Sequence, residues 1–281
     1  ISAPAIPRLP GLETFAGPAF HSARWPDGLD LAGKRVAVIG TGAPSMQIVP
    51  SIVDTVAALD VYQRTPQWVR HIPRFQDTMT EGARWLLEHV PFYAEWFRFT
   101  MLWRYGDGLL RTLRRDPDWP HPERAMNRMN DRHREQMTEH IARELAGRPD
   151  LLARCVPSYP PYAKRILLDN GWYRALRHPA ATLVTDGIER ITPAGPVAGA
   201  VERPVDAIVL ATGFEVFLNA ARLGIAGRAG TLADAWAGDD PRAHLGIAAP
   251  DFPNLFFVQG PNTVLAHGGS AIFTSECQAR Y

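Results

Sequence analysis

The stretch VAVIGTGAPSMQI, residues 36–48, constrains the fold more than any other part of the chain. The β-branched and apolar run KRVAVI, residues 34–39, suits a strand that is buried on both faces of a parallel sheet. Gly40 and Gly42 then allow a tight turn, and residues 46–56 continue with the apolar spacing of a helix. Because the first N–H groups of a helix attract anions, the stretch predicts an α/β fold with a turn that can hold a pyrophosphate.

The turn departs from the usual dinucleotide pattern, because serine stands in place of a third glycine. A glycine turn can also join a strand to a helix with no ligand at all. The nucleotide interpretation gains weight from a second apolar run, LDVYQ at residues 59–63, which completes a strand-helix-strand unit. We therefore expect a cofactor to contact Gly40, Thr41, Gly42, Ser45 and Gln47.

The end of the second strand indicates which nucleotide is bound. A site for NAD places an acidic residue about 20 positions beyond the glycines, where it holds the ribose 2′-hydroxyl. Here Arg64 stands 22 positions after Gly42, and Asp60 comes too early in the strand to take that place. A guanidinium suits a 2′-phosphate, so the sequence predicts NADP; the alternative is a solvated charge at a strand end.

Composition narrows the class of protein. Of 281 residues 46% are hydrophobic, enough for a large core, and the net charge of +1 gives no basic field for nucleic acid. No apolar run reaches the roughly 18 residues of a membrane span, and the first residues do not resemble a signal peptide. Cys155 and Cys277 form no CxxC pair, so we expect two buried, reduced thiols, no metal site, and a cytoplasmic protein with a small-molecule partner.

Upstream of the glycine turn lies the loop FAGPAFHSARWPDG. Taken alone, its histidine would more often be structural than catalytic. Directly before a GxG turn, however, the pattern resembles the fingerprint of the type I Baeyer-Villiger monooxygenases and their flavin-containing monooxygenase relatives. The residues that carry this resemblance are Phe15, Gly17, His21, Trp25 and Pro26.

Four further segments follow in the order of that family. Residues 63–66 (QRTP) resemble its NADP phosphate motif, and residues 162–165 (YAKR) resemble the segment of its active-site arginine. Residues 211–214 (ATGF) resemble its strand-end ATG motif, and residues 252–263 resemble the strand and turn that return the chain to the flavin. Together these motifs extend over nearly the whole chain.

The resemblance implies roles for individual residues. Lys164 would bind the NADP 2′-phosphate beside Arg64 and Thr65, while Arg165 would lie over the flavin as the catalytic residue. From the residues alone, two adjacent cations are equally consistent with surface charge. Thr212 and Gly213 would contact a cofactor, and the turn with Asn262 would present backbone groups to the flavin.

The resemblance also implies an activity. A protein of this family uses FAD and NADP, and inserts one oxygen atom from O2 into a ketone through a C4a-peroxyflavin to give an ester or lactone. The alternatives are an N- or S-oxygenating flavin-containing monooxygenase or, in another class, an inactive NADP-binding fragment. A disulfide reductase is disfavoured because a redox-active cysteine pair is missing. The family's first glycine turn, for FAD, is not in this sequence, so we expect a fragment that does not bind FAD alone.

The middle of the chain has a helical pattern over residues 80–152, with apolar positions three and four residues apart. We expect its aromatic run, residues 92–105, to pack in a core rather than lie on a membrane, and we expect His133 and His140 on a solvated helix face rather than at a metal. The expected architecture is that of a two-dinucleotide-binding flavoprotein in three parts. These are a linker and the end of a split FAD domain (1–28), a Rossmann-like NADP-binding domain (29–208) with a helical insertion at about 76–156, and an incomplete return into the FAD domain (209–281).

Overall fold

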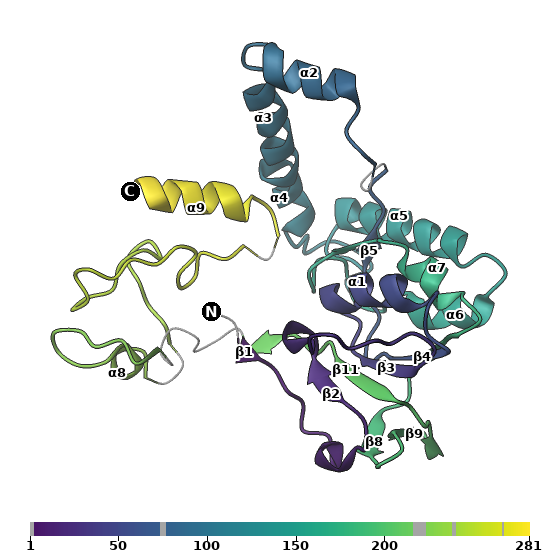
Figure 1. The fold of residues 1–281 in the computed structure, drawn as a ribbon. Coiled ribbons are helices and arrows are strands. Elements are labelled where there is room, and N and C mark those ends of the chain that lie inside the picture. Colours follow the sequence, from purple (N-terminus) through teal and green to yellow (C-terminus); the bar gives the residue numbers. More distant parts are fainter. Residues whose placement is uncertain (1–2, 74–76, 216–222, 238–239, 266) are drawn as a thin grey trace.

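A five-stranded parallel sheet forms the centre of the structure (Figure 1). The structure, a computed structural model, describes residues 3–73, 77–215, 223–237, 240–265 and 267–281. All four neighbouring strand pairs are parallel. The strands lie in the order β2 (Ala19–His21), β11 (Ala207–Leu210), β3 (Arg35–Ile39), β4 (Ala58–Tyr62) and β7 (Ala181–Val184).

Two of the inner strands, β11 and β3, explain the apolar runs of the sequence. Every residue of β11 is buried, and so is every residue of β3 after Arg35. A strand that is covered on both faces cannot alternate between apolar and polar side chains. The strand predicted at residues 34–39 is therefore confirmed as a core strand, one residue shorter than expected.

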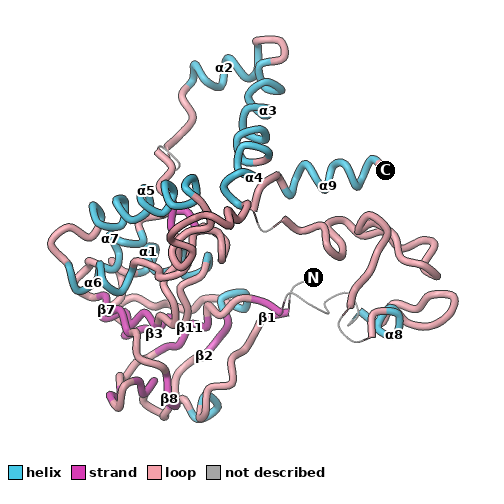
Figure 2. Tube along the Cα trace, turned by 180° about the vertical axis from the view of Figure 1, so that it is seen from behind, coloured by secondary structure: helices cyan, strands magenta, loops and turns pink. Residues whose placement is uncertain are grey.

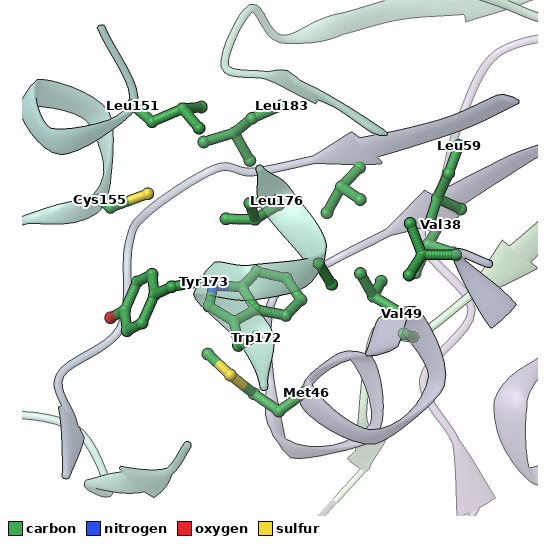
Figure 3. Packing of buried hydrophobic residues seen from close by; sticks show 14 of the residues in the cluster. Val38, Met46, Val49, Leu59, Leu151, Cys155, Trp172, Tyr173, Leu176 and Leu183 are labelled. Carbon is green, nitrogen blue, oxygen red and sulfur yellow. The ribbon is translucent and has the colours of Figure 1, made fainter. Parts of the chain in front are cut away.

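Two helices cover one face of the sheet. They are α1 (Ala43–Ile52), which follows the glycine turn, and α7 (Trp172–Leu176). Figure 3 shows Met46 and Val49 of α1 beside Trp172, and all three side chains are buried in one cluster. Their spacing on α1, three residues apart, places both side chains on the face that meets the sheet. This packing fixes the start of α1, and with it the glycine turn, above the sheet edge.

The other face of the sheet is covered by a small antiparallel sheet. Ile191 and Ala198 of this sheet share a buried cluster with Ile39 and Leu210 of the large sheet. The strands of the small antiparallel sheet are β8 (Ile188–Ile191), β9 (Pro196–Ala198) and β10 (Val201–Glu202). Two short pairs complete the strands, β1 (Ala3–Pro4) with β12 (Phe214–Glu215) and β5 (Val69–Arg70) with β6 (Leu167–Leu168).

Helices occupy the region between β5 and β6, as the sequence predicts. In Figures 1 and 2 the first three project away from the sheet, whereas the last two lie against the body of the molecule. In chain order they are α2 (Glu81–His89), α3 (Tyr93–Tyr105), α4 (Asp107–Leu113), α5 (Arg128–Glu144) and α6 (Pro149–Cys155).

The expectation of a packed aromatic stripe on α3 is wrong for the described chain. Trp96, Phe99 and Trp103 are between 56% and 58% exposed, and Trp85 of α2 is 55% exposed. Their spacing of three and four residues does place the three α3 rings side by side. The centroid of the Phe99 ring lies 6.2 Å from that of Trp96 and 6.0 Å from that of Trp103. Helical spacing predicts which side chains share a face, but not whether another element covers that face.

The C-terminal part, from residue 223, is mostly loop (Figure 2). It has a small cluster of its own that contains Leu232, Trp236 and Phe252. An ion pair between Arg98 and Glu276 joins α3 to the last helix. Within the described residues, no helix combines the length and the apolar character that crossing a bilayer requires. The helices of this part are α8 (Leu232–Ala235) and α9 (Ala271–Arg280), and two 3-10 turns, η1 (Leu12–Thr14) and η2 (Ser22–Arg24), lie near the other end of the chain.

The two cysteines differ, which corrects the expectation that both are buried. Cys155 at the end of α6 is buried in the main cluster, whereas Cys277 of α9 is exposed. Burial raises the pKa of the Cys155 thiol to about 12, because a thiolate is poorly solvated in an apolar surrounding.

We expect one of the two thiols to react with Ellman's reagent in the folded chain, because only the thiolate attacks the reagent. Cys277 should react quickly, and Cys155 only when denaturant unfolds the chain. The measurement is the number of thiols titrated with and without denaturant. A Cys277→Ser variant should show none in the folded state, and fast reaction of two thiols in the native chain would contradict the buried position of Cys155.

Candidate functional site

The glycine turn lies against the end of the neighbouring strand β11. Gly40 has φ of 112°, and a Cβ atom built on it would stand 2.5 Å from the Ala211 carbonyl oxygen. Gly42 caps α1 with no side-chain hydrogen bond, so the first N–H groups of the helix stay available. The Thr41 hydroxyl donates to the Thr65 carbonyl at 3.1 Å and joins the turn to the end of β4. The turn can thus present backbone donors and a helix amino terminus to an anion.

A cleft of about 860 Å³ opens in front of this turn. The Lys164 ammonium donates to the Thr65 hydroxyl at 2.8 Å and lies over the Tyr159 ring. Arg64, exposed at the end of β4, lines the same cleft, and neither cation forms an ion pair with the described residues. Two cations without an ion pair and a helix amino terminus therefore face one space, whose lining also includes Asp186. Of the predicted cofactor residues, the cleft is lined by Gly40, Thr41, Gly42, Arg64, Thr65, Lys164, Thr212 and Gly213.

Asp60, the acidic residue of β4, does not take the place of a ribose-binding acid, as the sequence predicts. Asp60 lies 3.9 Å from Arg203 and does not line the cleft. Burial raises the pKa of its carboxyl, and the Arg203 charge lowers it in part. Two positions along β4, the buried Tyr62 lines the cleft, and its hydroxyl has no hydrogen-bond partner among the described residues. Burial also raises the pKa of this phenol, so its hydroxyl stays neutral, and the hydroxyl oxygen itself is buried.

Two predicted cofactor residues of α1 do not line the cleft. Ser45 is completely buried, and its hydroxyl donates to the Gly40 carbonyl at 2.7 Å. The serine in place of the third glycine thus holds the turn itself together. Gln47 is exposed on the helix. Direct contact of these two side chains with a cofactor stays a prediction.

The fingerprint loop is joined to the ATG segment through His21. The Nδ1 atom of His21 accepts a hydrogen bond from the Ala23 N–H at 3.1 Å, so it carries no proton. The proton is assigned to Nε2, which lies 2.8 Å from the Gly213 carbonyl oxygen. His21 is therefore a buried, neutral positioning group at the rim of the cleft, and its ring also meets Phe214 edge to face at 5.4 Å.

The other fingerprint residues pack around this connection. A Cβ atom on Gly17 would stand 2.5 Å from the Asp206 carbonyl oxygen, so this position needs glycine. Trp25 meets Phe20 edge to face at 5.0 Å, and Phe15 packs against the cluster beneath β8. The Pro26 carbonyl accepts the Leu29 N–H at 3.3 Å. These residues shape the loop and supply no reactive group.

The ATG segment is held by the start of the chain. The Thr212 hydroxyl donates to the Ala5 carbonyl at 2.6 Å, and the Ala5 N–H donates to the Gly213 carbonyl at 2.9 Å. Asn262, with φ of 64°, lies in an exposed turn and lines neither cavity described here. Its predicted contact with a flavin stays a prediction.

A second cavity, of about 240 Å³, lies on the other side of the segment that carries the adjacent cations. Arg165 lines it, whereas its neighbour Lys164 lines the larger cleft. Arg70, Tyr162 and His267 also line the second cavity, and none of its lining residues is an acid. Lys164 and Arg165, which are adjacent in the sequence, thus line two different cavities. Sequence reasoning did not identify Arg70 or His267, because neither stands in a motif.

The two helix α5 histidines are not on a solvated face, contrary to expectation. His140 is buried, and its Nε2 atom lies 2.7 Å from Asp169 Oδ2. His133 is half-buried, with Nδ1 2.7 Å from the Tyr162 hydroxyl. The expectation that neither serves a metal stays untested, although no group of three or more ligating side chains occurs among the described residues.

These features define the class of protein as an α/β dinucleotide-binding protein, with a glycine turn, a cationic cleft at the carboxyl ends of parallel strands and a second cavity beside it. No family model matches the chain. The chain is 45% identical to the uncharacterized monooxygenase y4iD of Sinorhizobium fredii, over 99% of this chain and 42% of that protein. It is 39% identical to a Baeyer-Villiger monooxygenase of Pseudomonas aeruginosa, over 100% of this chain and 51% of that protein.

Solved structures agree with these relatives. Cyclohexanone monooxygenase bound to ε-caprolactone superposes with a TM-score of 0.77 at 27% identity, covering 99% of this chain and 58% of that one. OTEMO in complex with FAD and NADP superposes with a TM-score of 0.76 at 26% identity, covering 99% of this chain and 57% of that one. The resemblance is confirmed: the chain is homologous to the Baeyer-Villiger monooxygenases and shares the fold of these two-dinucleotide-binding flavoproteins. It spans about half the length of the curated relatives it matches.

Proposed function

We propose that this chain is the NADPH-binding part of an FAD-dependent Baeyer-Villiger monooxygenase, which inserts one oxygen atom from O2 into a ketone. The observation that carries the proposal is the convergence of Arg64, Thr65 and Lys164 on the cleft in front of the glycine turn. The relatives support the same activity, because several of them are named for it. An N- or S-oxygenating enzyme is not favoured by these names.

The cleft fits NADP on three observations. The glycine turn leads into the start of α1, whose first N–H groups have no side-chain cap and would bind a pyrophosphate. Arg64 and Lys164 have no anionic partner among the described residues, and a 2′-phosphate would supply one. The volume of the cleft, about 860 Å³, is within the range of small-molecule and cofactor sites. NADP bound here would supply the hydride.

FAD is a different case. Among the described residues, the arrangement of parallel strand, glycine turn and helix occurs once, at residues 35–52, and the proposal assigns that turn to NADP. We therefore place FAD binding in the longer polypeptide, with Thr212, Gly213 and Asn262 as contacts from this chain. The domain boundaries at residues 28, 208 and 281 and the helical insertion belong to the same proposal. Bound FAD would accept the hydride and activate O2.

Arg165 is the catalytic residue in this proposal. Its guanidinium is always ionised and cannot give up a proton at neutral pH. Placed at the second cavity, it would stabilise the negative charge that develops when oxygen is transferred to a ketone carbonyl. The lining of Ile166, Leu168, Val264 and Leu265 would receive an apolar ketone and reduce the access of water.

The substrate class is a ketone, and the structural neighbours were solved with such ligands. One neighbour holds cyclohexanone and another ε-caprolactone, the corresponding lactone. We propose a small ketone for this protein as well, with O2 as the second substrate. A cytoplasmic location is part of the proposal, supported by the two cysteines that form no disulfide.

We expect the purified 281-residue chain to bind NADP+ more tightly than NAD+, because only NADP+ carries the 2′-phosphate. Arg64→Ala should weaken NADP+ binding roughly tenfold or more, which is the effect of losing a hydrogen bond to a charged group. The affinity for NAD+ should not change. Isothermal titration calorimetry measures all of these constants, together with that of FAD, for which we expect no binding.

The matched control is Arg115→Ala, which removes an exposed arginine that lines neither cavity. This variant should bind NADP+ like the native chain. Equal affinity of the native chain for NADP+ and NAD+ would contradict the role of Arg64. Absence of binding for both would mean that the glycine turn only connects a strand to a helix.

A further inference from the structure

The segment between Tyr159 and Asp169 directs one cation into each of the two cavities. Its backbone has an unusual conformation at Tyr162, where φ is 70°. Residues other than glycine rarely adopt this left-handed conformation, and they keep it only where the surrounding structure fixes it. Lys164 follows two residues later and Arg165 three residues later. A change at Tyr162 would therefore alter the direction of both cations.

The Tyr162 side chain is fixed by two hydrogen bonds. Arg70 Nη2 donates to the hydroxyl oxygen at 2.7 Å, and His133 Nδ1 lies 2.7 Å from the same oxygen. An arginine can only donate, so the tyrosine oxygen accepts from Arg70. The hydroxyl proton is then assigned to the bond with His133, whose Nδ1 atom accepts it. Burial and the charges of Arg70 and Arg132 lower the pKa of His133, which agrees with a neutral imidazole.

Helix α5 holds this segment at three points. Asn130, His133 and His140 lie on one face of α5, because their spacing of three and seven residues matches whole helical turns. The Asn130 side-chain amide donates to the Pro161 carbonyl at 3.2 Å. At the far end, His140 Nε2 contacts Asp169 Oδ2 at 2.7 Å.

Residues 68–70, which include strand β5, hold the end of the segment. The Leu167 N–H donates to the Trp68 carbonyl at 3.0 Å, and the Asp169 N–H donates to the Arg70 carbonyl at 3.1 Å. Arg70 thus contacts the segment through both its backbone carbonyl and its guanidinium. Residues 163–166 lie between these fixed ends, and the first three of them are exposed.

We propose that Tyr162, His133 and Arg70 are positioning residues, which hold the segment so that Lys164 reaches the 2′-phosphate in the large cleft while Arg165 faces the second cavity. The proposal rests on the proposed function, because it assumes that the large cleft binds NADP. None of the three residues lines the large cleft. They act through the direction of the Lys164 and Arg165 side chains.

The experiment measures the preference for NADP+ over NAD+ in the 281-residue chain. Tyr162→Phe removes the hydroxyl and keeps the ring, and His133→Leu removes the acceptor. Each should lower the affinity for NADP+ about fivefold, the usual effect of one hydrogen bond, and leave the affinity for NAD+ unchanged. Tyr162→Phe breaks the bonds to both His133 and Arg70, whereas His133→Leu breaks only the first, so the double variant should be no weaker than Tyr162→Phe alone.

Two controls separate positioning from general damage. His133→Asn keeps an oxygen acceptor near the position of Nδ1 and should restore most of the NADP+ affinity. Gln136→Ala, on the exposed side of α5, should behave like the native chain. An unchanged preference in Tyr162→Phe, or an equal loss of affinity for both nucleotides, would overturn the proposal. If the native chain shows no preference for NADP+, the proposed function fails first, and this inference fails with it.

Discussion

Arg165→Ala, made in a polypeptide with the full length of the relatives, should lower the rate of oxygen insertion about 100-fold or more while NADPH still reduces the flavin. Losing one preorganised group that stabilises developing charge typically has an effect of this size. The hydride step should persist, because Arg165 lines the second cavity and not the nucleotide cleft. Stopped-flow absorbance measures flavin reduction, and gas chromatography measures the ester or lactone formed.

The control for this prediction is again Arg115→Ala, which removes an arginine outside both cavities. It should form product at the native rate. Product formation by Arg165→Ala at the native rate would remove Arg165 from the catalytic role. Loss of flavin reduction together with product would instead place Arg165 in nucleotide binding.

Gly40→Ala should destabilise the chain by about 3 kcal/mol or more, the range of severe steric and backbone changes. Its φ of 112° lies outside the region open to alanine, and the new Cβ atom would stand 2.5 Å from the Ala211 carbonyl oxygen. Either the turn or β11 must move, so NADP+ binding should be lost as well. Urea denaturation followed by circular dichroism gives the free energy of unfolding, and calorimetry gives the binding.

Gly33→Ala is the matched control, because Gly33 has φ of 67° but nothing lies within 4 Å of its added Cβ atom. Gly33→Ala should lower the free energy of unfolding by only about 1 kcal/mol, the cost of placing alanine in a left-handed backbone conformation. The difference between the two variants isolates the contact with β11. Equal free energies of unfolding would show that the turn can relax away from Ala211.

The sequence by itself determined the core strands and the nucleotide turn. An apolar run without alternation, such as residues 34–39, suits a strand that is buried on both faces, and β3 is such a strand. Glycine at position 40 is required by local backbone geometry, which a sequence pattern records directly. The position of Arg64 at the end of β4 likewise follows from the length of one strand-helix-strand unit. These features depend on residues close together in the chain.

Tertiary structure alone decided the partners of residues far apart in the chain. His133 and His140 looked like charges on a solvated helix until the fold placed residues 162–169 against them. The exposed rings of α3 show the reverse case, because their spacing suggested a packed stripe and the described chain leaves that face open. Periodicity fixes the direction of a side chain relative to its own helix, whereas its environment depends on what the rest of the chain packs there. The residues alone left Lys164 and Arg165 as two adjacent cations; the family resemblance implied separate roles for them, and the fold places them at separate cavities.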